Sequence, residues 1–295
     1  QNSVGTLQFE VADNKWGRTR VRVILRDDGG IAHRGTDFSE TTLEIIVNSV
    51  NDAPTFNIVD PVITVVENNE PLGHVRTGFI YNISSGHGED DPTSSVLQGQ
   101  SVRFVITHNF DHLFSVNPKI DLNGLLTFTT ANDEYGLATI TVYAEDNNMP
   151  PAVSVSKTFG INILPRNNAP SVDIQGDIVG RMVTECKSLA TCTKTFAGYA
   201  SNMWVGPINE RNVQSFTPTL VTCTIAPQFN VLFTAAPIVD TVTGNLVFTL
   251  AENKYTEVGN PVTVTCSFKD NGGTTDGGVD ITVRTFLLEV QAVED

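Results

Sequence analysis

Apolar and polar residues alternate in short runs along most of this chain. In the run "SVRFVIT", for example, Val102, Phe104 and Ile106 fall on one face of an extended segment. Glycine, asparagine, aspartate and proline interrupt these runs about every ten residues, which is typical of strands joined by turns. The pattern predicts an all-β chain of antiparallel β-sandwiches, each with a core roughly 10 Å thick between two sheets.

A phrase of the form Gly-x-Leu-x-Phe begins at Gly5, Gly124 and Gly244, which indicates an internal repeat. The first and third copies also share "DDGGIAHRGTDFS" and "DNGGTTDGGVDIT" at a constant offset of 243 residues. We therefore predict the C-terminal part of one repeat at 1–51, a complete repeat at 52–167 and a second complete repeat with disulfides at 168–295. The repeats are expected to be joined end to end, in an excerpt of a longer polypeptide.

An aromatic residue precedes the penultimate strand of each copy, at Trp16, Tyr135 and Tyr255. One interpretation is the tyrosine corner of immunoglobulin-like sandwiches, in which the ring closes the turn leading into that strand. The other is an ordinary aromatic residue of the core.

Four cysteines lie between residues 186 and 266, and their even number favours disulfides formed in an oxidising compartment. Alignment of the repeats places Cys223 and Cys266 at inward-facing positions on different strands. A bridge between them would close a loop of about 40 residues and contribute about 2–4 kcal/mol. Cys186 and Cys192 would then close a local loop, with the two other connectivities or free thiols as alternatives.

The formal net charge of −15 argues against nucleic acid and anionic lipid as partners. No apolar run is long enough to span a membrane, so we expect no membrane insertion in this segment. Nucleophile-elbow, zinc-protease and phosphate-loop motifs are missing from the sequence, and we expect no enzymatic activity.

The second repeat resembles a cadherin repeat in "VVENNEPLG", in "AEDNNMP" and in the closing "NNAP". The glycine-rich version in the other copies, ending in "VNDAPTF", is similar to cadherin-like and immunoglobulin-like tandem repeats of giant surface proteins. Adhesins and the flagellar-hair (mastigoneme-type) proteins of algae and protists contain such arrays. The resemblance implies an extracellular location, on a cell surface or a surface appendage.

In cadherins, calcium held by carboxylates stiffens the linkers, and calcium needs six to eight oxygen ligands. The resemblance implies a calcium site at the first joint, formed by Asn51, Asp52, Asp90 and Asp91. Ser49 and Ala53, however, stand where an aspartate and an asparagine would be expected. The alternative, in which no cofactor is required, is that Asn51 and Asp52 cap a turn that Pro54 stiffens.

Two further features concern the surface. Asn82 begins the sequon "NISS" in an expected loop, which predicts glycosylation and contact with glycans in a secreted protein. Arg18, Arg20 and Arg22 alternate on one strand and could dock an acidic repeat of a neighbouring chain. Alternatively, they form a ladder with two glutamates of the following strand, at positions 40 and 44.

The sequence as a whole favours a structural segment of a large extracellular repeat protein. Such a segment would form a rod or filament and associate with copies of itself or with other surface proteins. A calcium-stiffened adhesin stalk of cadherin-like repeats is the alternative.

Overall fold

The computed structural model describes residues 4–68, 73–87, 100–180, 183–188, 190 and 192–293 of the 295-residue chain. It is 48% strand and 6% helical, which confirms the all-β prediction. In the described part of the chain, no helix has the length and apolar character needed to cross a membrane.

The chain forms two compact units. The first contains Gln1–Ile63, Glu70–Thr129 and Leu137–Asn162, and the second contains Thr64–Asn69, Thr130–Gly136 and Ile163–Asp295. The second unit therefore includes two short segments of the second repeat together with its closing linker. The repeat boundaries at 51 and 167 remain a prediction.

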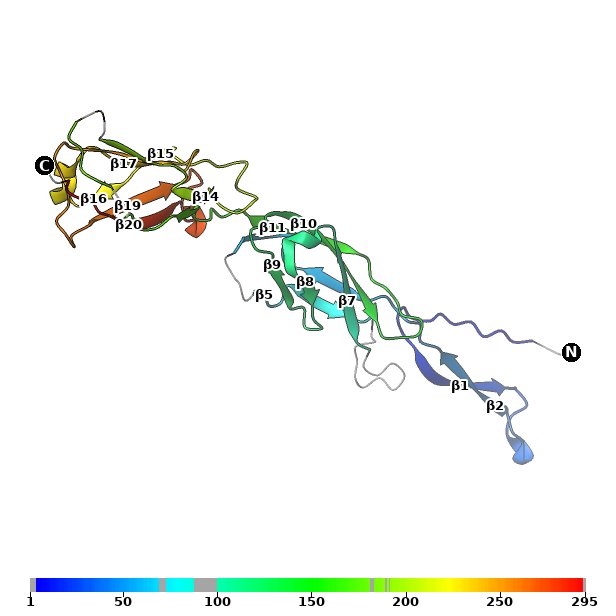
Figure 1. Cartoon of the computed structure of the whole chain (residues 1–295). Helices are drawn as coiled ribbons and strands as arrows, with labels where there is room; N and C mark the ends of the chain where they lie inside the picture. Colours follow the sequence, from blue (N-terminus) through cyan, green and yellow to red (C-terminus); the bar gives the residue numbers. More distant parts are fainter. Residues whose placement is uncertain are drawn as a thin grey trace. The chain divides into compact units, whose positions relative to one another are not determined.

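Strands β1 (Gly17–Arg26) and β2 (Phe38–Val47) form an antiparallel hairpin, drawn in blue in Figure 1. The second repeat forms a sheet in the order β4-β11-β10-β7, with two further sheets in the orders β3-β6 and β5-β9-β8. The bounds of its strands are β3 (Thr55–Ile58), β4 (Val62–Val66), β5 (His74–Arg76), β6 (Ile80–Ser84), β7 (Val102–His108), β8 (Phe114–Ile120), β9 (Leu126–Thr130), β10 (Gly136–Asp146) and β11 (Lys157–Leu164).

The third repeat forms sheets in the orders β13-β18-β17-β15, β16-β19-β20 and β12-β14. Its strands are β12 (Ser171–Ile174), β13 (Thr193–Phe196), β14 (Ala200–Trp204), β15 (Leu220–Thr222), β16 (Thr224–Ile225), β17 (Phe233–Asp240), β18 (Leu246–Leu250), β19 (Val262–Lys269) and β20 (Ile281–Leu288). Short 3₁₀ turns, η1 (Ala32–Arg34), η2 (Asp111–Leu113), η4 (Pro227–Leu232) and η5 (Thr275–Gly277), occupy connections between strands.

In the second and third copies the Gly-x-Leu-x-Phe phrase forms a turn followed by a core strand, whereas in the first copy Leu7 and Phe9 are 50% and 60% exposed and lie outside any strand. Gly124 has φ +76°, and a Cβ there would lie 2.1 Å from the carbonyl oxygen of Ile80. Gly244 has φ +74°, and a Cβ there would lie 2.1 Å from the carbonyl oxygen of Ala200. Only glycine combines that backbone conformation with so close an approach. The leucine and phenylalanine that follow are at most 1% exposed, at Leu126, Phe128, Leu246 and Phe248.

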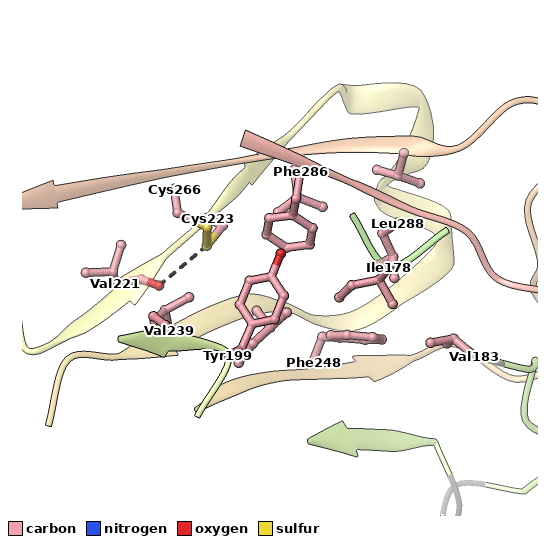
Figure 2. Packing of buried hydrophobic residues seen from close by; sticks show 14 of the residues in the cluster. Ile178, Val183, Tyr199, Val221, Cys223, Val239, Phe248, Cys266, Phe286 and Leu288 are labelled. Carbon is pink, nitrogen blue, oxygen red and sulfur yellow. Dashed lines mark hydrogen bonds between the residues drawn. A yellow bond between two sulfur atoms is a disulfide. The ribbon is translucent and has the colours of Figure 1, made fainter. Parts of the chain in front are cut away.

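Both expected disulfides form in the third repeat, Cys186 with Cys192 and Cys223 with Cys266. Figure 2 shows Cys223 and Cys266 beside Val221 and Val239 in the buried core. In the second repeat the aligned positions are occupied by apolar side chains, so the third repeat has a covalent link where the second has packing alone.

Tyr135 and Tyr255 are 41% and 52% exposed, so the interpretation as core aromatics is wrong for them. The buried tyrosine of the third repeat is Tyr199, whose hydroxyl donates to the carbonyl oxygen of Gly176 at 2.6 Å. Its ring packs against Phe286 with centroids 5.0 Å apart (Figure 2).

Candidate functional site: asparagine joints between repeats

The first linker is attached to the following repeat through the side chain of Asn51. Its Nδ2 donates to Oδ2 of Asp146 at 2.9 Å, and its Oδ1 accepts a hydrogen bond from Nε2 of Gln100 at 3.1 Å. Asp146 ends strand β10 and is only 4% exposed. Both polar atoms of the Asn51 carboxamide are therefore used within the first unit.

The carboxylate of Asp146 is fully engaged. Its second oxygen, Oδ1, accepts the backbone N–H groups of Asn148 and Ala152, each at 3.0 Å. A buried carboxylate with donors on both oxygens needs no cation to balance its lost hydration. Among the described residues of this joint, the oxygens of Asn51 and Asp146 are therefore better suited to hydrogen bonding than to binding calcium. Asp90 and Asp91 lie outside the described residues.

The second linker makes the same attachment with Asn167. Its Nδ2 donates to Oδ1 of Asp270 at 2.9 Å, to the carbonyl oxygen of Gly273 at 2.9 Å and to that of Val279 at 3.0 Å. The backbone N–H of Val279 donates in return to the carbonyl oxygen of Asn167 at 3.0 Å. Asp270 directly follows β19 and is 0% exposed. We call Asn51 with Asp146, and Asn167 with Asp270, the two Asn–Asp pairs.

A second contact recurs beside each Asn–Asp pair. In both cases the residue after the aspartate is an asparagine whose Oδ1 accepts a hydrogen bond from the backbone N–H of a serine. Asn147 accepts from Ser101 at 3.0 Å, and Asn271 accepts from Ser215 at 2.9 Å. Each serine follows a glutamine, so the dipeptide Gln-Ser recurs at 100–101 and 214–215. This dipeptide is the sequence signal that could have revealed the joint. Its two copies are 114 residues apart, so the dipeptide falls out of register with the Gly-x-Leu-x-Phe phrases at Gly124 and Gly244, which are 120 residues apart.

Side-chain amides also surround Asp133 in the second unit. Asn68 Nδ2 donates to its Oδ1 at 2.8 Å, while the backbone N–H of Asp133 donates to Asn68 Oδ1 at 3.1 Å. Asn168 Nδ2 donates to the same carboxylate oxygen at 3.2 Å, and Asn209 Nδ2 donates to the Asp133 carbonyl oxygen at 2.6 Å. Asparagine is thus the main hydrogen-bond donor at this joint.

An acidic cavity of about 210 Å³ lies beside these amides, lined in part by Glu67 and Glu210. Oε1 of Glu67 accepts the backbone N–H of Arg166 at 2.7 Å, and Oε1 of Glu210 accepts that of Asn168 at 2.9 Å. The two glutamates are 1% and 5% exposed. Within the described residues, the other carboxylate oxygen of each is buried without a hydrogen-bond partner, as are Oδ2 of Asp270 and the side-chain oxygens of Asn167, Asn209 and Gln214.

Burial is the main cause of three raised pKa values at this joint. It raises the pKa of Glu67, against the opposing effect of the Arg166 backbone N–H. Burial also raises the pKa of Glu210, and the negative charges of Glu67 and Asp270 raise it further. The pKa of Asp270 is raised for the same reason, in spite of its hydrogen bonds from Gly272 and Asn167. The positive charges of Arg166, near Glu67, and of Lys269, near Asp270, oppose these shifts without cancelling them.

No group of three or more histidine, cysteine, aspartate or glutamate side chains that could hold a metal ion occurs among the residues that the structure describes. Carboxylate and amide oxygens together are nevertheless the donor chemistry that calcium prefers, and at the second joint six of them are buried without partners. The residues of the second joint therefore fit a hard cation better than those of the first.

The remaining candidate residues lie away from the joints. Asn82 is exposed and sits in strand β6 rather than in a loop, with a φ of 50°. Arg22 pairs with Glu40 at 3.6 Å, and Arg20 lies opposite Glu44 in the β1–β2 register. Arg18 lies opposite an isoleucine, so the predicted ladder includes two of the three arginines by position.

No protein-family model matches this chain, and no curated protein matches it. Solved structures do match. The extracellular cadherin domains 1–5 of protocadherin gamma B2 align over 94% of this chain and 46% of their own length, with 16% identity and a TM-score of 0.44. Human CDH23 EC21-23 aligns over 87% and 69% with 14% identity and a TM-score of 0.37, and Drosophila N-cadherin EC1-4 over 96% and 60% with 14% identity and a TM-score of 0.32. The chain thus spans less than half the length of the protocadherin that it matches.

Proposed function

We propose that this chain is a structural segment of a large extracellular protein, in which tandem sandwiches form a rod or filament. In this role it associates with copies of itself or with other surface proteins. The observation that carries the proposal is the recurrence of the Asn–Asp pair, with one donor–acceptor distance of 2.9 Å at both joints.

The Asn–Asp pairs support this role because they shorten the free linker. Strand β2 ends at Val47 and β11 at Leu164, so only residues 48–50 and 165–166 separate each strand from its fixed asparagine. A shorter flexible segment has fewer conformations and transmits orientation from one repeat to the next. A spacer whose purpose is to maintain length benefits from such a joint.

Two other features support an extracellular setting. The two disulfides persist in an oxidising compartment. The exposed Asn82 in its sequon is a glycosylation site in our proposal, which mass spectrometry of the native protein would test.

Negative-stain images of the native particle test the structural role. We expect a regular filament in which this chain repeats along an ordered lattice. Isolated flexible strings, each ending in a binding module, would instead favour the adhesin interpretation.

The second candidate function is a calcium-stiffened adhesin stalk, and the acceptor-rich cavity of the second joint favours it. Glu67 and Glu210 would hold the ion there, whereas Asn51 and Asp52 would do so at the first joint together with Asp90 and Asp91. A bound calcium ion would add positive charge between the buried carboxylates. Melting temperature and protease resistance that are the same with calcium and with a chelator would reject this candidate.

A further inference from the structure

The first repeat contains a loop with the same backbone as the loop that receives Asn167. The two loops are residues 27–37 and 270–280. The N–H of Asp27 donates to the carbonyl oxygen of Asp37 at 3.0 Å, just as Asp270 donates to Asp280 at 3.0 Å. The N–H of Gly29 donates to Oδ1 of Asp27 at 2.9 Å, and the N–H of Gly272 donates to Oδ1 of Asp270 at the same distance. The carboxylate therefore has the same place in both loops.

The carbonyl groups of the two loops also match. Left-handed residues occur at corresponding positions, with φ 56° at His33 and 54° at Asp276. A Cβ placed on Gly35 would lie 3.0 Å from the carbonyl oxygen of Gly30, and one on the corresponding glycine of the second loop would lie 3.0 Å from that of Gly273. Loop 27–37 is thus already in the conformation that binds an asparagine in loop 270–280.

In loop 270–280 the ligand is known, because it is the side chain of Asn167. The three acceptors that receive its amide are Asp270 Oδ1 and the carbonyl oxygens of Gly273 and Val279. Their counterparts, at the offset of 243 residues, are Asp27 Oδ1 and the carbonyl oxygens of Gly30 and Thr36.

The difference between the loops is exposure. Asp27 and Gly30 are exposed, whereas Asp270 is 0% exposed. Neither linker asparagine of this chain is free to serve loop 27–37, since Asn51 is bonded to Asp146 and Asn167 to Asp270. The acceptors of the first loop face solvent with their geometry already fixed.

We propose that loop 27–37 is a binding site for an asparagine of an Asn-x-Ala-Pro linker other than the two in this chain. The side-chain amide donates to Asp27, Gly30 and Thr36, and the N–H of Thr36 donates to the main-chain carbonyl of the same asparagine. Because the site contacts both ends of one residue, it selects asparagine over glutamine, whose amide lies one methylene further from the main chain. A lysine lacks the fixed planar NH₂ group that meets all three acceptors.

Disulfide tethering tests the proposal at the low affinity expected of a short peptide. The full chain carrying Asp28→Cys is equilibrated, over a series of thiol concentrations, with a peptide in which cysteine and two glycines precede Pro-Arg-Asn-Asn-Ala-Pro. Matched peptides carry alanine, glutamine or lysine in place of the first asparagine. Mass spectrometry measures the fraction of protein that retains each peptide.

The thiol concentration that releases half of the bound peptide should be at least about fivefold higher for the asparagine peptide than for the alanine, glutamine and lysine peptides. A difference of this size follows from two or three net hydrogen bonds. This preference should disappear when Asp27→Ala is added to the protein. Equal retention of all four peptides, or a preference that survives Asp27→Ala, would overturn the proposal.

Discussion

Removing the amide of Asn167 should destabilise the second unit by about 3 kcal/mol. The side chain donates hydrogen bonds to three acceptors, and each bond contributes about 0.5–1.5 kcal/mol net. Asn167→Ala also leaves the buried carboxylate of Asp270 with fewer donors, which costs about 1–3 kcal/mol more, while the freed loop recovers some conformational entropy. The sum of these opposing contributions gives the expected loss.

Urea unfolding followed by the fluorescence of Trp204 measures this loss. The protein has two tryptophans, so Trp16→Phe makes Trp204 the sole reporter of the second unit. Asn230→Ala, the same substitution at an exposed asparagine away from the joint, serves as the control and should stay within about 0.5 kcal/mol of the parent.

A double-mutant cycle with Asp270→Ala assigns the energy to the pair. If Asn167 acts through Asp270, the two substitutions together should cost less than the sum of their separate costs, by about 1–2 kcal/mol. A loss below about 0.5 kcal/mol for Asn167→Ala, or strictly additive costs, would show that the Asn–Asp pair does not hold the joint.

Three other predictions concern the cores and the acidic cavity. Because the folded-state pKa of Glu210 is raised, the stability it contributes is fully present below pH 4.5 and is lost as the pH rises through that raised value. Glu210→Gln, in chelator, should therefore raise the unfolding free energy at pH 7 and have less effect near pH 4.5; a gain independent of pH would contradict the burial argument. Replacing Cys223 and Cys266 together with alanine should cost about 4 kcal/mol, because their bridge spans 43 residues of chain; calorimetry showing less than about 1 kcal/mol would refute it. Gly244→Ala should lower the melting temperature far more than Gly198→Ala, since a Cβ at the first position would lie 2.1 Å from a backbone oxygen while the second has no atom within 4 Å; equal effects would contradict the steric account.

Core features were predictable from the sequence because they depend on local alternation. The faces of β10 and β19, the glycine turns and both disulfides follow from the side-chain period of two and from alignment of the repeats. Alignment was sufficient for Cys223 and Cys266 because a sandwich fixes which side chains face inward.

The joints were less predictable because they depend on loops without periodicity. Glu210 lies in a turn of the third repeat, and no alternation places it beside Glu67. Asn51 was recognised as a linker residue, but its partner Asp146 is 95 residues away in the chain. For Tyr135 and Tyr255 the sequence leaves two interpretations open, and their exposure excludes the core aromatic while leaving the tyrosine corner as a prediction.

The central claim, that linker asparagines hold the joints, is tested most directly by the side-chain amide protons of Asn167. NMR in buffer containing chelator can follow their exchange with solvent, with assignment by comparison with Asn167→Ala. We expect exchange much slower than for the side chain of the exposed Asn230, because the amide donates to three acceptors, one of which is the buried carboxylate of Asp270. Exchange as fast as that of Asn230, or protection that appears only when calcium is added, would contradict the account.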